Sequence, residues 1–276
     1  MTVPDILSWH RERTFVVFGD MLGFGALVGA HPETGEARLV RATTARQDRQ
    51  SDAPDDDLAL EARFMKFNGL LNAHITDLDL KNRVTAFIFS DSFYIATDAG
   101  DALLSFSAPL MRAMILNDVP VRMGIGYGSF CLYRASYESG LSTRFHQLQF
   151  LGKGVVNSYW AESTGLKGMR IGINPSLFES DIPFDETLTL RLGASERLPH
   201  CGFELNYLHP TLTPTRDFVA PQKLYRELSA CVERMGEPLK ANARVSQHYD
   251  RTLRALSRMS RAARRFEPPP RRTGRS

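Results

Sequence analysis

The sequence predicts an α+β fold of the ferredoxin-like split βαβ type, with a C-terminal helical extension. Between residues 14 and 173, apolar runs typical of strands alternate with segments of helical spacing, in the order β-α-β-β-α-β and then α-β. Residues 223–266 are mostly helix-forming. A chain of 276 residues suits one domain of about 150–200 residues with elaborations. We therefore expect a domain over 1–180, an extension over 181–266 and a disordered tail over 267–276.

The first strand is expected at residues 14–20, where a continuous apolar run ends in the carboxylate of Asp20. Residues 31–57 are polar and contain two prolines, so we expect a mobile insertion there. Asp57 is expected to cap the helix that follows. The apolar residues of that helix recur three or four positions apart: Leu60, Phe64, Phe67, Leu71 and Ile75.

The middle of the unit is expected to be a hairpin followed by a second helix. Strand-like runs at 83–89 and 93–97 flank a short turn that contains Asp91. Apolar residues at helical spacing then predict a helix that ends at residues 117–120.

Several glycines mark the last elements of the unit. Residues 121–128 predict a strand whose glycines indicate close approach by a ligand or by another backbone. Residues 151–163 predict a glycine turn that enters a helix, and residues 167–173 predict a further strand. In the extension, residues 203–208 predict a strand. The helical part has one apolar face, formed by Leu224, Leu228, Cys231 and Met235.

The composition, 43% hydrophobic and 24% charged, is that of a soluble globular protein. No apolar run approaches the ~20 residues that a membrane span needs, and the first 13 residues have no signal-peptide core. The three cysteines lie far apart and form no Cys-x-x-Cys pair, so neither a disulfide framework nor a zinc site is expected. We therefore expect a cytoplasmic protein with no membrane partner.

The net charge of +3 is unevenly distributed along the chain. From Arg251 onward there are nine arginines and one acid, Glu267, which leaves 25 basic and 30 acidic residues elsewhere. This basic end raises the alternative of a nucleic-acid-binding protein. No helix-turn-helix, zinc finger or interleaved aromatic and basic residues support that alternative. We expect a solvated helix and no nucleic-acid partner.

Two aspartates are expected to meet at one end of the sheet. In a split βαβ fold the first strand lies beside the hairpin strands, so Asp20 and Asp91 emerge together. Neighbouring carboxylates repel unless a cation lies between them. Mg²⁺ or Mn²⁺ is the usual cation, because substrate phosphates complete its shell. Gly23 and Gly25 are expected to turn backbone N–H groups toward those phosphates at a helix start.

Four segments resemble class III nucleotidyl cyclase catalytic domains, and most closely the Pycsar antiphage pyrimidine cyclases. The segments are FGDMLGF at 18–24, FSDS at 89–92, VRMGIGYG at 121–128 and GKGVVNSYWAE at 152–162. The first resembles the D-[IML]-x-G-F signature, and the second resembles the hairpin of the second metal aspartate. The resemblance implies two divalent metal ions, Mn²⁺ or Mg²⁺, bound by Asp20, Asp91 and the backbone of Met21.

Three departures from adenylate cyclases favour a pyrimidine substrate. Phe87 stands where those enzymes carry a base-reading lysine, and Gln149 and Phe150 stand where they carry an acid or threonine. Ala161 stands where they carry a transition-state arginine. A site that lacks its hydrogen-bonding groups loses a factor of about 10⁴ in discrimination. Arg122 is our candidate substitute for the missing phosphate-binding charge, and thus a third catalytic residue beside the aspartates.

The resemblance implies cyclisation of UTP, ahead of CTP, to the 3′,5′-cyclic monophosphate and pyrophosphate, as a second messenger read by a separate effector protein. It implies a homodimer with shared active sites, with Tyr159 and Glu162 near the shared surface. The expected nucleotide-binding residues are Met21, Gly23, Phe24, Gly25, Phe87, Gln149, Asn157 and Tyr159. Because the transition-state arginine is absent, the alternative is a catalytically inactive module of the same fold that binds a nucleotide or a protein.

Overall fold

A computed structural model gives the structure of the protein. The residues it describes are 5–22, 56–77, 84–138, 144–163, 166–180, 185–193, 196, 198–212, 220–240 and 242–266. Gly23, Phe24 and Gly25, residues 31–55 of the predicted insertion and the tail at 267–276 lie outside them.

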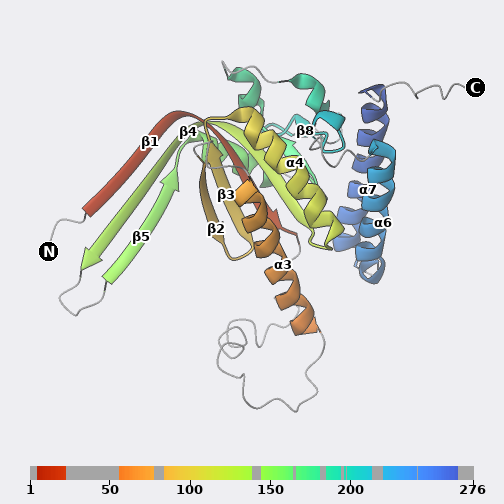
Figure 1. Ribbon diagram of the computed structural model, residues 1–276, viewed down its shortest axis with the longest axis horizontal. Helices are drawn as coiled ribbons and strands as arrows, with labels where there is room; N and C mark the ends of the chain where they lie inside the picture. Colours follow the sequence, from red (N-terminus) through yellow and green to blue (C-terminus); the bar gives the residue numbers. More distant parts are fainter. Residues whose placement is uncertain are drawn as a thin grey trace, which may run out of the picture.

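The first six elements form the predicted split βαβ unit. They are β1 (Asp5–Met21), α3 (Asp56–Asp77), β2 (Thr85–Phe89), β3 (Ser92–Thr97), α4 (Gly100–Leu116) and β4 (Val121–Glu138). Their strands lie in the order β2-β3-β1-β4, and each pair of neighbours is antiparallel (Figure 1). This order places the first strand between the hairpin and the last strand, as the split βαβ unit requires. The predicted fold class is therefore confirmed.

The remaining strands widen this sheet, and two helices follow. The elements are β5 (Arg144–Leu151), α5 (Lys153–Ser163), β6 (Ile171–Ile173), β7 (Thr189–Arg191), β8 (Phe203–Leu205), α6 (Pro221–Gly236) and α7 (Ala243–Ala263), with short 3₁₀ turns at Pro175–Glu179, Glu186–Leu188, Pro210–Leu212, Glu237–Leu239 and Arg264–Phe266. β6 lies parallel to β4 and is followed in the sheet by β8 and β7. α6 and α7 are the predicted helical extension.

Two strands are longer than predicted, and β5 and β7 were not predicted at all. β1 begins at Asp5 rather than Thr14, and β4 continues to Glu138 rather than ending at Gly128. The added halves pair with each other, and β5, which was not predicted, pairs with the added half of β4 to form the long arm in Figure 1. These segments mix polar, charged and apolar residues without strict alternation, so periodicity does not reveal them.

The expected cap at Asp57 is also wrong. α3 begins at Asp56, so Asp57 lies inside the helix rather than before it. A capping residue has non-helical backbone angles and precedes the first helical residue, which excludes that role for Asp57.

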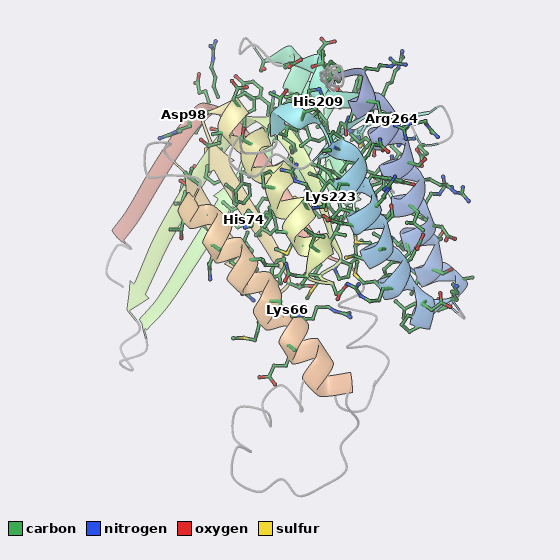
Figure 2. The ribbon with its side chains drawn as sticks, turned by 45° about the vertical axis from the view of Figure 1, so that its right-hand side comes forward. Lys66, His74, Asp98, His209, Lys223 and Arg264 are labelled. Carbon is green, nitrogen blue, oxygen red and sulfur yellow. The ribbon has the colours of Figure 1, made fainter. Side chains whose placement is uncertain are left out.

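The two faces of the sheet differ in their covering layers. Helices α3, α4, α6 and α7 cover one face, each in contact with the next (Figure 2). The predicted apolar face of α6, formed by Leu224, Leu228, Cys231 and Met235, is buried in this layer. On the other face, α5 packs against β4 and β1 over a smaller cluster. None of the helices in the described ranges has the length and apolarity to cross a membrane.

Candidate active site

Asp20 lies at the end of β1, on the α5 face of the sheet. Its Cα is paired with Ser92 of β3 and with Arg122 of β4. Side chains alternate between the two faces of a strand. Phe18, two residues earlier, belongs to the cluster on the α5 face, so Asp20 points to that face too.

Asp91 lies beside Asp20 because the hairpin turn is bound to the end of β1. The amide of Met21 donates a hydrogen bond to the carbonyl oxygen of Asp91 at 2.9 Å. Ser90, the preceding turn residue, has a left-handed φ of 35°. The two carboxylates are close enough for the charge of Asp91 to affect the pKa of Asp20. The structure thus brings the two predicted aspartates together.

The environment of Asp20 disfavours its charged form. Burial is the largest cause, followed by the negative charges of Glu162 and Asp91, while Arg122 acts in the opposite direction. Together they raise the pKa of Asp20 to about 7. A cation that takes the place of the proton between the two carboxylates would stabilise the charged form of Asp20.

Glu162 also lies at this site. From the sequence it was expected only near the shared surface of a dimer. It is 3% exposed, accepts a hydrogen bond from the Nε atom of Arg122 and forms an ion pair with the Nη2 atom of the same guanidinium. Arg122 also donates from Nη1 to the carbonyl oxygen of Leu166 at 3.2 Å. Burial raises the pKa of Glu162, and Arg122 opposes that rise. Arg122 is therefore held between Glu162 and the Asp20 end of β1.

Glycines in β4 allow α5 to bring Glu162 this close. A Cβ atom at Gly124 would meet the carbonyl oxygen of Ser158 and the amide of Glu162, and one at Gly126 would meet the amide of Ser158. The glycines predicted to allow close approach thus accommodate another backbone, that of α5. Their spacing of two residues, on one face of a strand, was the available signal that a helix packs directly there.

Phe87 and Gln149 do not come together. Phe87 is buried in the α5-face cluster, and its ring stacks on Phe150 with centroids 5.2 Å apart. Gln149 is exposed. Because it precedes Phe150 on β5, it points to the opposite face of the strand from the ring that contacts Phe87. Tyr94 belongs to the same ring cluster, with its ring centroid 4.7 Å from that of Phe150.

Asn157 and Tyr159 both lie on α5 but have different surroundings. The amide group of Asn157 donates to the carbonyl oxygen of Tyr127 at 2.9 Å and so ties α5 to β4. Tyr159 is 47% exposed and packs its ring against Phe18, with centroids 5.5 Å apart. Phe18 itself is two residues from Asp20, so Tyr159 is near the aspartates while Asn157 faces the sheet.

The donor set at the end of β1 fits a divalent cation that is shared with phosphates. Among the residues that the structure describes, no group of three or more His, Cys, Asp or Glu side chains is placed to hold a metal ion. Asp20 and Asp91 supply two adjacent carboxylates. Mg²⁺ is usually bound by one or two carboxylates, with substrate phosphates and water as its other ligands, and Mn²⁺ prefers the same oxygen donors. The pair therefore suits a cation that arrives with a nucleotide.

In the absence of metal, we expect Asp20→Asn to be more stable than the wild-type protein at pH 8. The pKa of Asp20 is about 7 in the fold against an ordinary value of 3.8, so the folded state binds more protons than the unfolded state between these values. Folding is therefore disfavoured progressively as the pH rises from about 4 to 7. Asparagine cannot ionise and avoids this cost. The Tm gap between variant and wild type should widen from pH 4 to pH 8.

Adding Mn²⁺ with a nucleoside triphosphate provides the internal control. A ligand that binds only the folded state raises its Tm, so the wild type should gain stability and Asp20→Asn should not. A gap that stays constant across pH would contradict the expected burial of a carboxylate at this position.

No protein-family model matches the chain, and no curated protein matches it. The solved structures to which it is similar include three cyclases. The guanylyl cyclase domain of a RhoGC fusion protein from the aquatic fungus Blastocladiella emersonii is 13% identical, over 62% of this chain and 84% of that one, with a TM-score of 0.37. A Trypanosoma brucei adenylate cyclase is 15% identical, over 76% and 92%, with a TM-score of 0.40. A bacterial light-regulated adenylyl cyclase is 14% identical, over 82% and 58%, with a TM-score of 0.43. At these values, the function has to be inferred from the residues of this chain.

Proposed function

We propose that the chain is a metal-dependent nucleotidyl cyclase that converts UTP, ahead of CTP, to the 3′,5′-cyclic monophosphate and pyrophosphate. The observation that carries this proposal is the adjacency of Asp20 and Asp91 at one end of the sheet. The cationic Arg122 lies directly opposite Asp20 on the neighbouring strand β4. Paired carboxylates beside an arginine suit the binding of a metal-bound triphosphate.

The reaction is a single in-line displacement within the substrate. The ribose 3′-oxygen forms a bond to the α-phosphorus, the bond from that phosphorus to the leaving oxygen breaks, and the 3′-hydroxyl proton is released to solvent. Asp20 and Asp91 would hold two divalent metal ions together with the carbonyl of Met21. When bound, such ions make the hydroxyl more acidic and neutralise charge on the phosphates. Arg122 adds a fixed positive charge for the α-phosphate.

The surroundings of Phe87 support a pyrimidine base. Phe87 is stacked on the ring of Phe150, so its side chain supplies an apolar surface and no hydrogen-bond donor. A site built to read adenine would need such a donor, and the loss of one costs a factor of about 10⁴ in discrimination. The choice of UTP over CTP follows from the resemblance to the Pycsar cyclases, as does a role in antiphage defence through a separate effector protein.

A homodimer with shared active sites is part of this proposal. Three apolar side chains of α5 remain exposed in the single chain, namely Val156 at 41%, Tyr159 at 47% and Trp160 at 40%. Exposed apolar groups on one helix are typical of an association surface. They lie on the same helix as Glu162, so a partner bound there would border the site.

Val156→Glu is therefore expected to convert a dimer to a monomer. A carboxylate at this position would be desolvated at the interface without a partner. Sedimentation velocity should report half the wild-type mass, and cyclase activity should fall with it. Met65→Glu is the matched control, because Met65 is also apolar and 64% exposed but lies on α3, across the sheet. A monomeric wild type, or a dimeric Val156→Glu variant, would contradict the shared site.

The function itself is tested by incubating the purified protein with Mn²⁺ and each of ATP, GTP, CTP and UTP, and identifying the products by chromatography and mass spectrometry. A cyclic pyrimidine monophosphate that disappears in the Asp20→Ala, Asp91→Ala double variant would support the proposal. A cyclic purine product would retain the reaction and overturn the base choice.

The second candidate function is an inactive cyclase-fold module that binds a nucleotide or a protein. It is favoured by Ala161, which stands in place of the expected transition-state arginine, and by the engagement of Arg122 with Glu162. Tight nucleotide binding to the folded wild type, without any cyclic product from the four triphosphates, would support this candidate over the enzyme.

A further inference from the structure

The segment at residues 166–170, which leads from α5 into β6, is bound to the strand that carries Arg122. The carbonyl oxygen of Leu166 accepts the Nη1 hydrogen bond of Arg122 at 3.2 Å. At the other end of the segment, the amide of Met123 donates to the carbonyl oxygen of Arg170 at 3.0 Å. Any shift of this segment would therefore move a hydrogen-bond partner of Arg122.

The C-terminal extension binds the same segment from its other side. Thr252 of α7 is fully buried, and its Oγ1 atom accepts the amide hydrogen of Met169 at 2.9 Å while its hydroxyl donates to the carbonyl oxygen of His248 at 2.7 Å. The Nδ1 atom of His248 accepts the amide hydrogen of Gly168 at 3.2 Å. Two consecutive backbone amides of the segment thus end on side chains of α7.

The backbone of the segment is shaped to allow this approach. Gly168 has a left-handed φ of 98°, and a Cβ atom there would lie 2.6 Å from the Oγ1 of Thr252 and 2.8 Å from the carbonyl oxygen of His248. Burial, and after it the positive charges of Arg122 and Lys167, lower the pKa of His248. A neutral imidazole keeps Nδ1 as an acceptor for the amide of Gly168.

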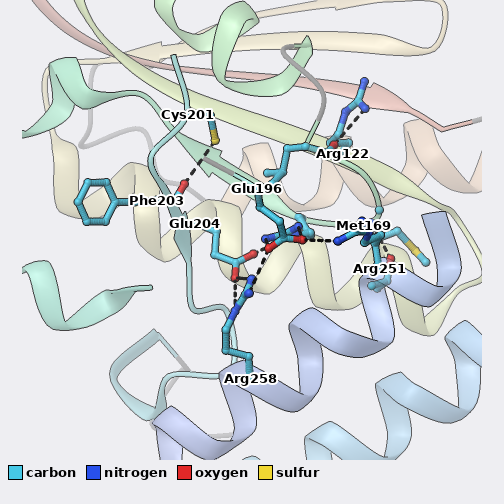
Figure 3. A network of polar contacts seen from close by, with 12 residues as sticks. Arg122, Met169, Glu196, Cys201, Phe203, Glu204, Arg251 and Arg258 are labelled. Atoms are coloured by element: carbon cyan, nitrogen blue, oxygen red, sulfur yellow. Dashed lines mark hydrogen bonds and ion pairs between the residues drawn. The ribbon is translucent and has the colours of Figure 1, made fainter. Parts of the chain in front are cut away.

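A buried ionic network holds α7 in this position. Arg170, 1% exposed, donates to Glu204, 0% exposed, at 2.6 Å and to Glu196 at 3.1 Å. Arg258 of α7 binds both glutamates, and Arg251 of α7 binds Glu196 at 3.2 Å (Figure 3). Loss of one partner from a buried ion pair strongly destabilises the folded protein. The network therefore holds α7 against residues 166–170.

We propose that α7 contributes to the active site and that Thr252 is a positioning residue. Thr252 holds residues 166–170 in place, and the carbonyl of Leu166 in that segment holds Arg122. The inference rests on the proposed function, because the position of Arg122 affects a reaction only if Asp20 and Asp91 carry it. Two groups fix Arg122: Glu162, which lies on α5, and the carbonyl of Leu166, which lies just after α5. α7 braces the second of them.

The test compares Thr252→Val, Thr252→Ser and Arg254→Ala in the full-length protein, at a temperature well below the Tm of each. Valine retains the shape of threonine and removes the hydroxyl, whereas serine restores it. We expect Thr252→Val to lower kcat about 10-fold with KM within about twofold, as for other residues that orient a group in the site. Thr252→Ser should recover wild-type kcat. Arg254, exposed on the same helix, is the control and should leave kcat unchanged.

A second readout does not depend on turnover. The Nε–H group of Arg122, bonded to Glu162, gives its own ¹⁵N–¹H signal, which is assigned by its absence in Arg122→Lys. Thr252→Val should shift this signal and speed its hydrogen exchange, and Thr252→Ser should restore both. If Thr252→Val fails to fold, Gln247→Met removes the 2.7 Å hydrogen bond between Lys167 and Gln247 at the less buried end of the contact and should lower kcat about threefold.

The outcomes separate this inference from the proposed function. An active wild type whose Thr252→Val or Gln247→Met variant keeps full kcat and an unchanged Arg122 signal would overturn the inference alone, and would leave α7 a purely stabilising helix. A wild type that forms no cyclic nucleotide would overturn the proposed function and this inference with it, whatever the Arg122 signal does.

Discussion

Replacement of Asp20 by asparagine is expected to lower kcat for cyclic nucleotide formation more than about 100-fold. Loss of a group that merely orients a metal ligand already costs about 10–100-fold, and asparagine removes a charged ligand itself. The fold should persist, because asparagine has the same shape and Asp20 is only partly buried. The measurement is product formation with Mn²⁺ and UTP, beside a thermal melt of each variant.

Asp91→Asn is expected to act in the same way, because the turn that carries Asp91 is hydrogen-bonded to Met21, next to Asp20. Asp98→Asn is the matched control. Asp98 follows β3, at the opposite end of that strand from Asp91. It pairs with Arg11 at 2.8 Å on the surface, where an ion pair contributes only about 0–1 kcal/mol. It should therefore retain wild-type activity. A fully active Asp20→Asn variant would remove the metal site from the proposal.

The sequence was informative wherever local pattern and burial coincide. The hairpin around Asp91 and the helix at Gly100–Leu116 were predicted from apolar runs and their interruptions, because β3 of the hairpin and the helix both bury apolar residues in the main core. The arm was not, because residues 5–11 of β1 are placed by their pairing with residues 130–136 of β4. Pairing partners more than 100 residues apart leave no periodic signal.

In the candidate site, too, local sequence pattern was informative and contacts between distant residues were not. Asp20 and Asp91 were identified because each ends a strand-like run and lies in a motif of its own. The contact of Arg122 with Glu162 joins residues 40 positions apart, and that of Met169 with Thr252 joins residues 83 apart. Such contacts depend on sheet register and helix docking, which a single sequence does not specify. The paired glycines at 124 and 126 were the one local sign of them.

Gly124→Ala is expected to lower both stability and activity, because the added methyl group would collide with backbone rather than with a side chain. It would meet the carbonyl oxygen of Ser158 and the amide nitrogen of Glu162 well inside van der Waals contact. Neither atom can move by a rotamer change, so α5 must shift away from β4. Overpacking of this kind costs about 1–3 kcal/mol, and the Tm should fall accordingly.

The effect on activity follows from which residue moves. Glu162 lies on the part of α5 that Gly124 contacts, and its carboxylate binds Arg122. A shift of the helix would therefore separate this pair and leave Arg122 misplaced beside Asp20. We expect kcat to fall more than about 10-fold even below the lowered Tm, a loss in the range seen when a group that orients the site is disturbed.

Gly69→Ala is the matched control for this substitution. Gly69 lies on α3 with no atom within 4 Å of an added Cβ, and alanine is favoured over glycine in a helix by about 1 kcal/mol. This variant should melt at a higher temperature than the wild type and retain its kcat. If Gly124→Ala matched it in both respects, α5 would not pack on β4 as closely as the structure has it, and the placement of Glu162 beside Arg122 would have to be abandoned.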